Sequence, residues 1–234
     1  MTLQPNTRVW RYMSFAKLVS LLQRKRLWLS SAELLYDKWE GIPDTRQINT
    51  IINKRPSSIS AEAALDQTAK TVIAQRKQTF INCWTASEHE SLALWRIFCP
   101  SPEGVAIQTT LERLKKSVGL PVLEVRYGLH ETNDTLPDVM KLVTQKRPMF
   151  AYEQEVRLVL VQDFTDSKHP DRRTIGAEID WDPELHIENI RVHPDAEFWF
   201  AETVTETVRR LAPKLCQDGH PPVWYSEMSA HPPL

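Results

Sequence analysis

Apolar residues recur along the chain at spacings that predict short strands interspersed with helices. After a strand at residues 8–12, the apolar positions from Phe15 to Leu22 follow the period of a helix that Ser14 caps. A long helix is predicted over about 60–78. The other predicted strands are 27–31, 79–84, 104–109, 121–128, 147–161, a hairpin partner near 173–180, 186–192 and the final "PVWYS" at 222–226. The other predicted helices begin at Ser87 or cover 110–118, about 135–146 and about 195–215.

The order of these elements favours an α+β domain. Strands and helices do not alternate strictly, so we expect mixed, mostly antiparallel sheets with flanking helices. No repeat or low-complexity run marks a boundary, which predicts a single domain over residues 1–234 with its core at about 8–226. Residues 42–57 are polar and irregular in pattern, and we expect a loop there that could serve as a mobile lid.

Composition excludes several classes of protein. With 41% hydrophobic and 25% charged residues, the chain is typical of soluble globular proteins. A net charge of −1 gives no chain-wide reason to expect nucleic-acid binding, although Arg24, Lys25 and Arg26 form a small basic cluster. The chain has no signal-peptide pattern and no apolar run near the roughly 20 residues that span a bilayer. Three cysteines without metal-ligand spacing fit a reducing compartment, so we predict a cytoplasmic protein.

An acid pair lies within the apolar stretch "RPMFAYEQEVRLVLV". Glu153, Glu155 and Arg157 would share one face of a strand over 147–161, because successive side chains of a strand alternate between faces. Two carboxylates at that spacing suit a reaction in which one stabilises positive charge on a sugar carbon and the other accepts a proton. The alternative is an exposed strand face on which Arg157 pairs with either glutamate.

Two further segments carry candidate ligand contacts. Arg11 lies between Trp10 and Tyr12 on the first strand and suits a phosphate or pyrophosphate, which arginine can bind bidentately. An arginine reaching out from an edge strand is the alternative. The segment "NCWTAS" at 82–87 ends at a predicted helix start, where free backbone N–H groups favour an anion, with Thr85 and Ser87 adding hydroxyls. Helix capping by Ser87 is the simpler interpretation.

Other aromatic and acidic residues are expected to be structural. Trp95 follows on the predicted helix, where packing in the core is the default expectation. Asp37, Trp39 and Glu40 form a polar and aromatic turn that we expect to fix the loop after it.

Other chemistries find little support in the chain. It has no glycine-rich phosphate loop, no H-E-x-x-H and no G-x-S-x-G, and its seven histidines show no ligand spacing. A metal-dependent nuclease using Asp37, Glu153 and Glu155 is an alternative, although no lysine completes an E-x-K pattern at the strand. We therefore expect no metal ion.

Several segments together resemble a bacterial family known as domain of unknown function 2971. They are "WRYMSF", "LWLSS", "YDKWEG", "FINCWTASEHESLALWRIF", "GVAIQTT", "YEQEVRLVL" and "IENIRVHP", in matching order from about residue 8 to 226. That family in turn is distantly similar to the ADP-ribosyltransferase superfamily. The second resemblance implies a split β-sandwich and an enzyme that uses NAD as a substrate.

The resemblance also implies roles for the candidate residues. Arg11 matches the arginine of the superfamily's first strand, Glu155 its catalytic glutamate, and Glu153 the glutamate that arginine-modifying members carry two residues earlier. Glu155 would bind the ribose 2′-OH while nicotinamide departs, and Glu153 would orient or deprotonate the acceptor. NAD would contact Arg11 and "NCWTAS", including Thr85 and Ser87, with the nicotinamide stacked on an aromatic side chain. The implied aromatic candidates are Tyr12, Trp84 and Trp95.

The match departs from the superfamily at the middle strand. Arginine-containing members usually read Ser-Thr-Ser there, whereas this chain reads Cys-Trp-Thr-Ala-Ser at residues 83–87. The acceptor stays open among protein, nucleic acid and small molecule. The alternatives to an enzyme are a nucleotide-binding module without turnover, for example in phage defence, and an interaction protein.

Overall fold

The structure is a computed structural model and describes residues 3–37, 39–40, 42–128, 139–162, 175–217 and 219–229. Its strands are β1 (Arg8–Ser14), β2 (Arg26–Ser31), β3 (Thr79–Ala86), β4 (Gly104–Thr110), β5 (Val122–Glu124), β6 (Arg126–Tyr127), β7 (Gln145–Lys146), β8 (Glu155–Val161), β9 (Gly176–Asp180), β10 (Asn189–Val192) and β11 (Val223–Tyr225). Its α-helices are α1 (Phe15–Arg24), α2 (Thr45–Lys54), α3 (Ala61–Lys77), α4 (Leu92–Phe98), α5 (Leu111–Ser117), α6 (Val139–Leu142), α7 (Pro183–His186) and α8 (Phe198–Leu211). Three short 3-10 helices are η1 (Ala32–Leu34), η2 (Pro148–Glu153) and η3 (Pro213–Leu215).

The strands form a nine-stranded sheet that divides at β3, and β6 and β7 form a separate pair. One edge of β3 pairs with β8 along its whole length, from Thr79↔Val161 to Thr85↔Glu155. The other edge is shared, because β1 pairs with it only at Val9↔Ala86 and Trp10↔Thr85 while β2 pairs only at its opposite end. Only the β10–β11 and β6–β7 pairs are parallel among the described strands. The predicted α+β class with mostly antiparallel strands is therefore confirmed, and the expected split lies at β3.

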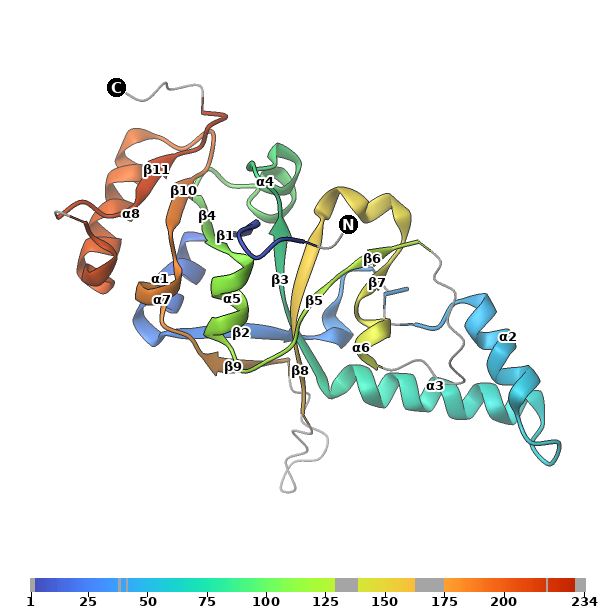
Figure 1. Cartoon of the computed structure of the whole chain (residues 1–234). Helices are drawn as coiled ribbons and strands as arrows, with labels where there is room; N and C mark the ends of the chain where they lie inside the picture. Colours follow the sequence, from blue (N-terminus) through green and yellow to red (C-terminus); the bar gives the residue numbers. More distant parts are fainter. Residues whose placement is uncertain are drawn as a thin grey trace.

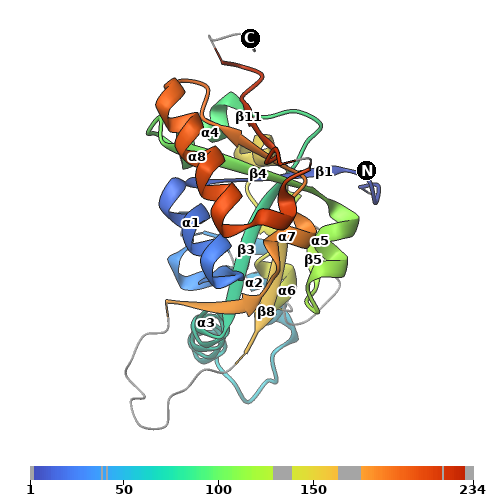
Figure 2. The same cartoon turned by 90° about the vertical axis from the view of Figure 1, so that its left-hand side faces the viewer.

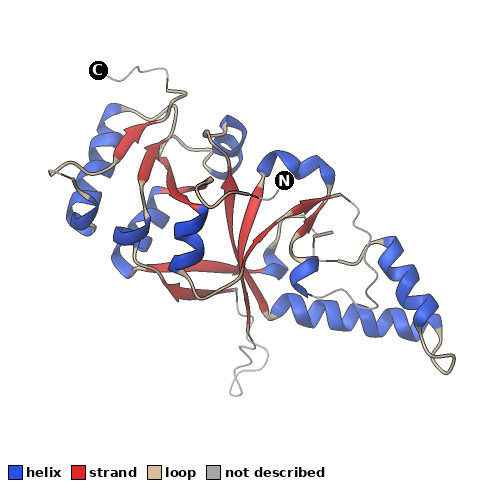
Figure 3. Ribbon diagram, in the orientation of Figure 1, coloured by secondary structure: helices blue, strands red, loops and turns tan. Residues whose placement is uncertain are grey.

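Helices cover the sheet unequally. α1 and α8 lie together over one face of the sheet, where α1 contacts β1, β2 and β4 and α8 contacts β10 and β11 (Figure 2). The main apolar core fills this layer, with fully buried Leu18 from α1 and Val204 from α8. At the other end of the molecule, α2 and α3 form a helical pair that extends away from the strands (Figures 1 and 3). None of the described helices has the length and hydrophobicity that crossing a membrane would require.

Residues 42–57 were expected to be irregular, and the structure places α2 there instead. Asp44 accepts a hydrogen bond from Gln47 N, and the Gln47 side chain accepts one from Asp44 N, so the helix begins with a capping box. Asp-x-x-Gln is a weaker signal than Ser-x-x-Glu, which is why the polar composition misled the prediction.

The predicted strand over 147–161 is also wrong in its first half. Pro148 begins η2, which runs to Glu153, and β8 begins only at Glu155. Proline fixes φ near the helical value and suits the first position of a helical turn. Glu153 and Glu155 are therefore not two residues of one strand.

Several boundaries also differ from the prediction. The strand over 121–128 is broken into β5 and β6, and the helix over 135–146 is reduced to α6 followed by β7, with 135–138 outside the described residues. β9 pairs with β2 rather than with the strand before it, so the expected hairpin is wrong. The helix expected from Ser87 begins at Leu92, because the Ser91 hydroxyl accepts the capping bond from Leu94 N.

Candidate functional site

The division of the sheet opens a cavity of about 660 Å³ beside the middle of β3. Where β1 and β2 diverge from β3, Arg11, Ser30 and Cys83 come to line the same space. Its opposite wall comes from η2, β7 and the start of β8. We call this space the main cavity.

Glu153 and Glu155 both line the main cavity, although η2 and β8 hold them separately. Gln154 between them has a left-handed backbone with φ of 44°, which turns the chain sharply from the 3-10 helix into the strand. Both carboxylates reach the ammonium of Lys146, with Nζ 2.5 Å from Glu153 Oε2 and 3.7 Å from Glu155 Oε1. The turn thus brings the acid pair together at one cation.

Four of the surrounding charges form a closed ring. Arg157 donates from Nε to Glu155 Oε2 at 2.8 Å and also pairs with Glu40, while Lys146 Nζ lies 3.8 Å from Glu40 Oε2. We call Glu40, Arg157, Glu155 and Lys146 the charge ring, to which Glu153 is attached through Lys146. The exposed fractions of these side chains range from only 1% to 8%.

The charges around the ring do not cancel. Three carboxylates, of Glu40, Glu153 and Glu155, face two cations, so one negative charge is left over unless a proton is bound. Burial, opposed in part by the bond from Lys146, raises the pKa of Glu153 to about 7. Burial also acts to raise the pKa of Glu155, but the charges of Arg157 and Lys146 outweigh it and the pKa is lowered. Near neutral pH, Glu153 is therefore the acid that gains or loses a proton, whereas Glu155 stays ionised.

Arg11 stands apart from these ion pairs. Its Nη1 is buried and has no hydrogen-bond partner within the described part of the chain, while the residue lines the main cavity. Burial lowers the pKa of Arg11 to about 10, so the guanidinium remains charged at neutral pH. A partly buried arginine in a cavity wall, with one buried nitrogen that lacks a partner, is suited to an anionic ligand group.

The aromatic candidates are held in the protein interior. Trp84 lines the main cavity but is only 1% exposed, because its Nε1 donates to Asn82 Oδ1 and its ring packs near Trp181. Trp95 is fully buried and does not line the main cavity, because it packs edge-to-face on Tyr12 with ring centroids 5.0 Å apart. The Tyr12 hydroxyl accepts a bond from Ser91 N, although Tyr12 does border the cavity.

The two hydroxyl candidates are separated by the structure. Thr85 lines the main cavity beside the acid pair, opposite Glu155 in the β3–β8 register. Ser87 is not among its lining residues, and its hydroxyl accepts a bond from His89 N.

The aromatic side chains with free surface at the main cavity come from elsewhere in the chain. Tyr36, Phe98 and Tyr152 line it and are 94%, 48% and 47% exposed. Tyr36 and Tyr152 lie in the quoted segments "YDKWEG" and "YEQEVRLVL", but neither they nor Phe98 were chosen as ligand contacts. Glu40 and Lys146 were also not assigned to the site, although Glu40 was placed in the neighbouring turn.

The nuclease alternative is not supported by its acidic residues. Asp37 lines the main cavity but is engaged by Arg147, whose Nε and Nη2 each lie 3.0 Å from one carboxylate oxygen. Across the described ranges, no group of three or more histidine, cysteine or acidic side chains is arranged to hold a metal ion.

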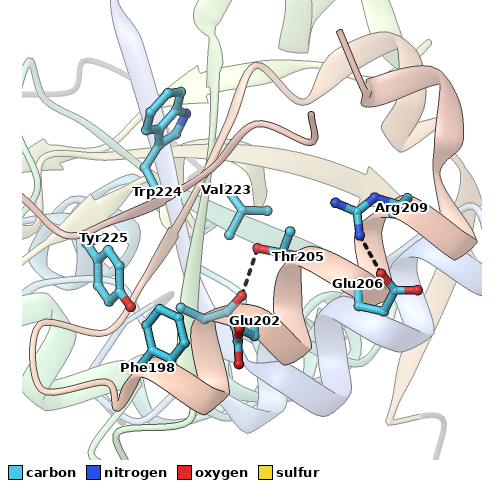
Figure 4. Close-up of a pocket in the computed structure, with 9 residues that line it drawn as sticks. Phe198, Glu202, Thr205, Glu206, Arg209, Val223, Trp224 and Tyr225 are labelled. Atoms are coloured by element: carbon cyan, nitrogen blue, oxygen red, sulfur yellow. Dashed lines mark hydrogen bonds and ion pairs between the residues drawn. The ribbon is translucent and has the colours of Figure 1, made fainter. Parts of the chain in front are cut away.

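A second hollow lies on the outside of the molecule between α8 and β11. Figure 4 shows Phe198, Glu202 and Tyr225 around this groove of about 410 Å³, with Glu206 and Arg209 paired beside it. Its ion pairs join residues three and four positions apart on α8, whereas the charge ring at the main cavity is buried and joins different segments of the chain.

Comparisons with known proteins identify no family. No family model and no curated protein matches the chain, so the expected membership of the domain of unknown function 2971 is not confirmed. Two solved structures of Thermus sp. 2.9 DarT are similar, one in complex with ADP-ribosylated ssDNA and one in complex with carba-NAD+. They have TM-scores of 0.45 and identities of 14% and 13%, and the matches cover 97% of this chain and 97% and 98% of theirs. A structural similarity at this TM-score identifies no function for this chain.

Proposed function

We propose that this protein binds NAD in the main cavity, cleaves the nicotinamide–ribose bond and transfers ADP-ribose to an acceptor. One observation carries the proposal: the acid pair and the unpartnered guanidinium of Arg11 line the same cavity. The acceptor would be a protein, a nucleic acid, a small molecule or water.

The charges of the cavity suit a ligand that is positive at one end and negative at the other. The charge ring with Glu153 carries an excess negative charge, whereas Arg11 supplies a positive charge without a partner. NAD has both features, because its nicotinamide ring is cationic and its pyrophosphate is anionic. Coulombic attraction at both ends therefore favours this class of ligand.

The acid pair suits the chemical step. Positive charge develops on the ribose carbon as nicotinamide leaves, and the ionised carboxylate of Glu155 would stabilise it. Glu153 exchanges a proton near neutral pH, which suits a group that accepts a proton from the attacking hydroxyl, amine or amide. Arg157 and Lys146 fix Glu155 from two sides, so the carboxylate needs little reorganisation during the step.

Release of nicotinamide from NAD by the purified protein tests the proposal. Glu155→Gln should lower the rate roughly 100-fold, because loss of one charge-stabilising group costs about 3 kcal/mol in the transition state. The assay should include cell lysate as a source of acceptors, with label on the adenylate part of NAD.

Two controls separate catalysis from folding. Glu188→Gln removes a carboxylate that pairs with Arg113 outside the main cavity, so it should leave the rate unchanged. Urea denaturation of Glu155→Gln would show whether the variant is folded under assay conditions. A wild-type protein that binds NAD but releases no nicotinamide, with or without lysate, would contradict the catalytic proposal.

A second candidate is a nucleotide-binding module without turnover. The observation in its favour is that Arg157 donates from both Nε and Nη2 to the same oxygen of Glu155, which leaves only Oε1 for a substrate hydroxyl. This alternative predicts saturable binding of NAD or a related nucleotide, with equal affinity for the intact and the nicotinamide-free molecule.

A further inference from the structure

We propose that Lys146 is the positioning residue of the site: its ammonium holds Glu153 and Glu155 together at the cavity wall and determines which of them carries a proton. This inference rests on the proposed function only for its activity readout. The distances around Lys146 that support it do not depend on whether the protein binds or cleaves NAD.

Lys146 is placed where it can act on every acid of the site. Its Nζ lies 2.5 Å from Glu153, 3.7 Å from Glu155 and 3.8 Å from Glu40, and its side chain is only 8% exposed. β7 holds it in position by pairing with β6, in register Tyr127↔Lys146. Tyr127 in turn accepts a hydrogen bond from Glu155 N at 2.8 Å, so the β6–β7 pair fixes both Lys146 and the backbone of Glu155.

The two acids depend on Lys146 unequally. Glu155 has Arg157 as a second cation, whereas Lys146 is the cation that bonds to Glu153 in the described part of the chain. Glu153 also shares a side-chain hydrogen bond with Glu155, in which a protonated Glu153 donates to the ionised Glu155. Removal of the ammonium would therefore affect the proton on Glu153 more than the charge on Glu155.

The groups that face Glu153 come from every neighbouring element. They are Tyr152 on η2, Glu155 on β8, Lys146 on β7 and Tyr127 on β6. Arg157 and Glu40 act one step further away, through their contacts with Glu155 and Lys146. The tyrosines stay neutral at physiological pH, because burial raises the pKa of each. The balance is therefore set by two cations and three carboxylates.

Two substitutions at the site should move the titration of Glu153 in opposite directions. Lys146→Met removes a cation and should raise its midpoint by about 1 to 3 pH units, the usual effect of one nearby opposite charge. Glu40→Gln removes a negative charge that competes for Lys146, and should lower the midpoint by a smaller amount, since Glu40 acts across the ammonium. Lys146→Arg keeps the charge and should restore a midpoint near that of the wild type.

Carbon-13 NMR of glutamate-labelled protein measures the midpoint directly, with the Glu153 signal assigned through Glu153→Gln. The acid limb of the pH profile for nicotinamide release should shift in the same direction in each variant. Lys115→Met is the matched control, because Lys115 is exposed on α5 away from the main cavity and its loss should shift neither measurement.

The outcomes separate this inference from the proposed function. A midpoint that stays fixed in both Lys146→Met and Glu40→Gln overturns the role of Lys146, whatever the enzyme activity. Opposite shifts without any nicotinamide release from the wild type support Lys146 and contradict the NAD-cleaving function. If Lys146→Met does not fold, Lys146→Gln replaces it, because the amide removes the positive charge yet can still donate a hydrogen bond to the acids. A Glu153 midpoint that stays fixed in Lys146→Gln then overturns the role of Lys146.

Discussion

The ion pairs around the main cavity and those on α8 show two ways in which one chain places charge. On α8, Glu206 pairs with Arg209, three residues further along the helix (Figure 4), and with Arg210, four residues further along. All three side chains are 45–75% exposed. In the charge ring, Glu40, Lys146 and Arg157 come from distant segments and are at most 8% exposed. Local spacing is enough for the first arrangement, whereas the second exists only in the folded protein.

The difference has an energetic consequence. An exposed pair on a helix gains little, because water already solvates both charges. A buried ring gains little as a whole, yet each member is essential once the others are present, since an uncompensated buried charge is costly. The contrast between the two regions can therefore be tested by removing one member from each.

The largest effect is expected for Arg157→Met. It leaves Glu40 and Glu155 buried without the cation that bonds both, and should lower the free energy of unfolding by about 3–5 kcal/mol. Urea denaturation at neutral pH measures this loss. A loss below about 1 kcal/mol would mean that water or a proton compensates the two acids, and the contrast with α8 would disappear.

Arg11→Met is expected to change binding rather than stability. The buried Nη1 has no partner within the described part of the chain, so its removal should leave the free energy of unfolding unchanged or raise it. A hydrogen bond from a charged group to an anion contributes about 1.5–3 kcal/mol, so its loss should weaken NAD binding roughly 10- to 150-fold. Isothermal titration calorimetry measures this change in affinity. Arg8→Met on the same strand is the control, because the Arg8 side chain bonds the Glu88 carbonyl instead. Equal NAD affinity in both variants would remove Arg11 from the site.

The smallest effect is expected on α8. Glu206→Gln removes both pairs with Arg209 and Arg210 and should leave the urea midpoint unchanged within error, because all three groups are solvated. The same substitution measured at low and high salt should give the same result. A clear loss of stability would show that the exposed ion pairs of Glu206 contribute to the free energy of unfolding, contrary to the contrast with the charge ring.

Patterns along the chain predicted the elements whose stability is local. The apolar period from Phe15 to Leu22 predicted α1, and the helix predicted over about 60–78 corresponds to α3, both nearly at their observed bounds. The strands β3 and β4 were likewise predicted from runs of β-branched and aromatic residues. These signals lie within a few residues of each other, so no knowledge of distant contacts is needed.

The candidate site was harder to predict, because its key contacts join distant parts of the chain. Glu153, Glu155 and Arg11 were selected from local patterns, and the structure brings all three to the main cavity. Lys146 lay at the end of a predicted helix, so nothing in the sequence connected it with the acid pair. In the structure it is part of β7, and its ammonium contacts Glu153 from there. Trp95 was one of three implied aromatic contacts, yet it is fully buried against Tyr12 and does not line the main cavity.

The closed form of the charge ring also constrains how this protein can evolve. A lineage that loses Arg157 keeps Glu40 and Glu155 buried without the cation that bonds both, and one that loses Lys146 keeps Glu153 without its bonded cation. Single replacements at these positions should therefore be removed by selection. Tolerated changes should come as compensated sets, with positions 40, 146, 155 and 157 substituted together. Correlated substitution at these four positions would then mark distant relatives more reliably than the short acidic motif, which many unrelated sequences share by chance.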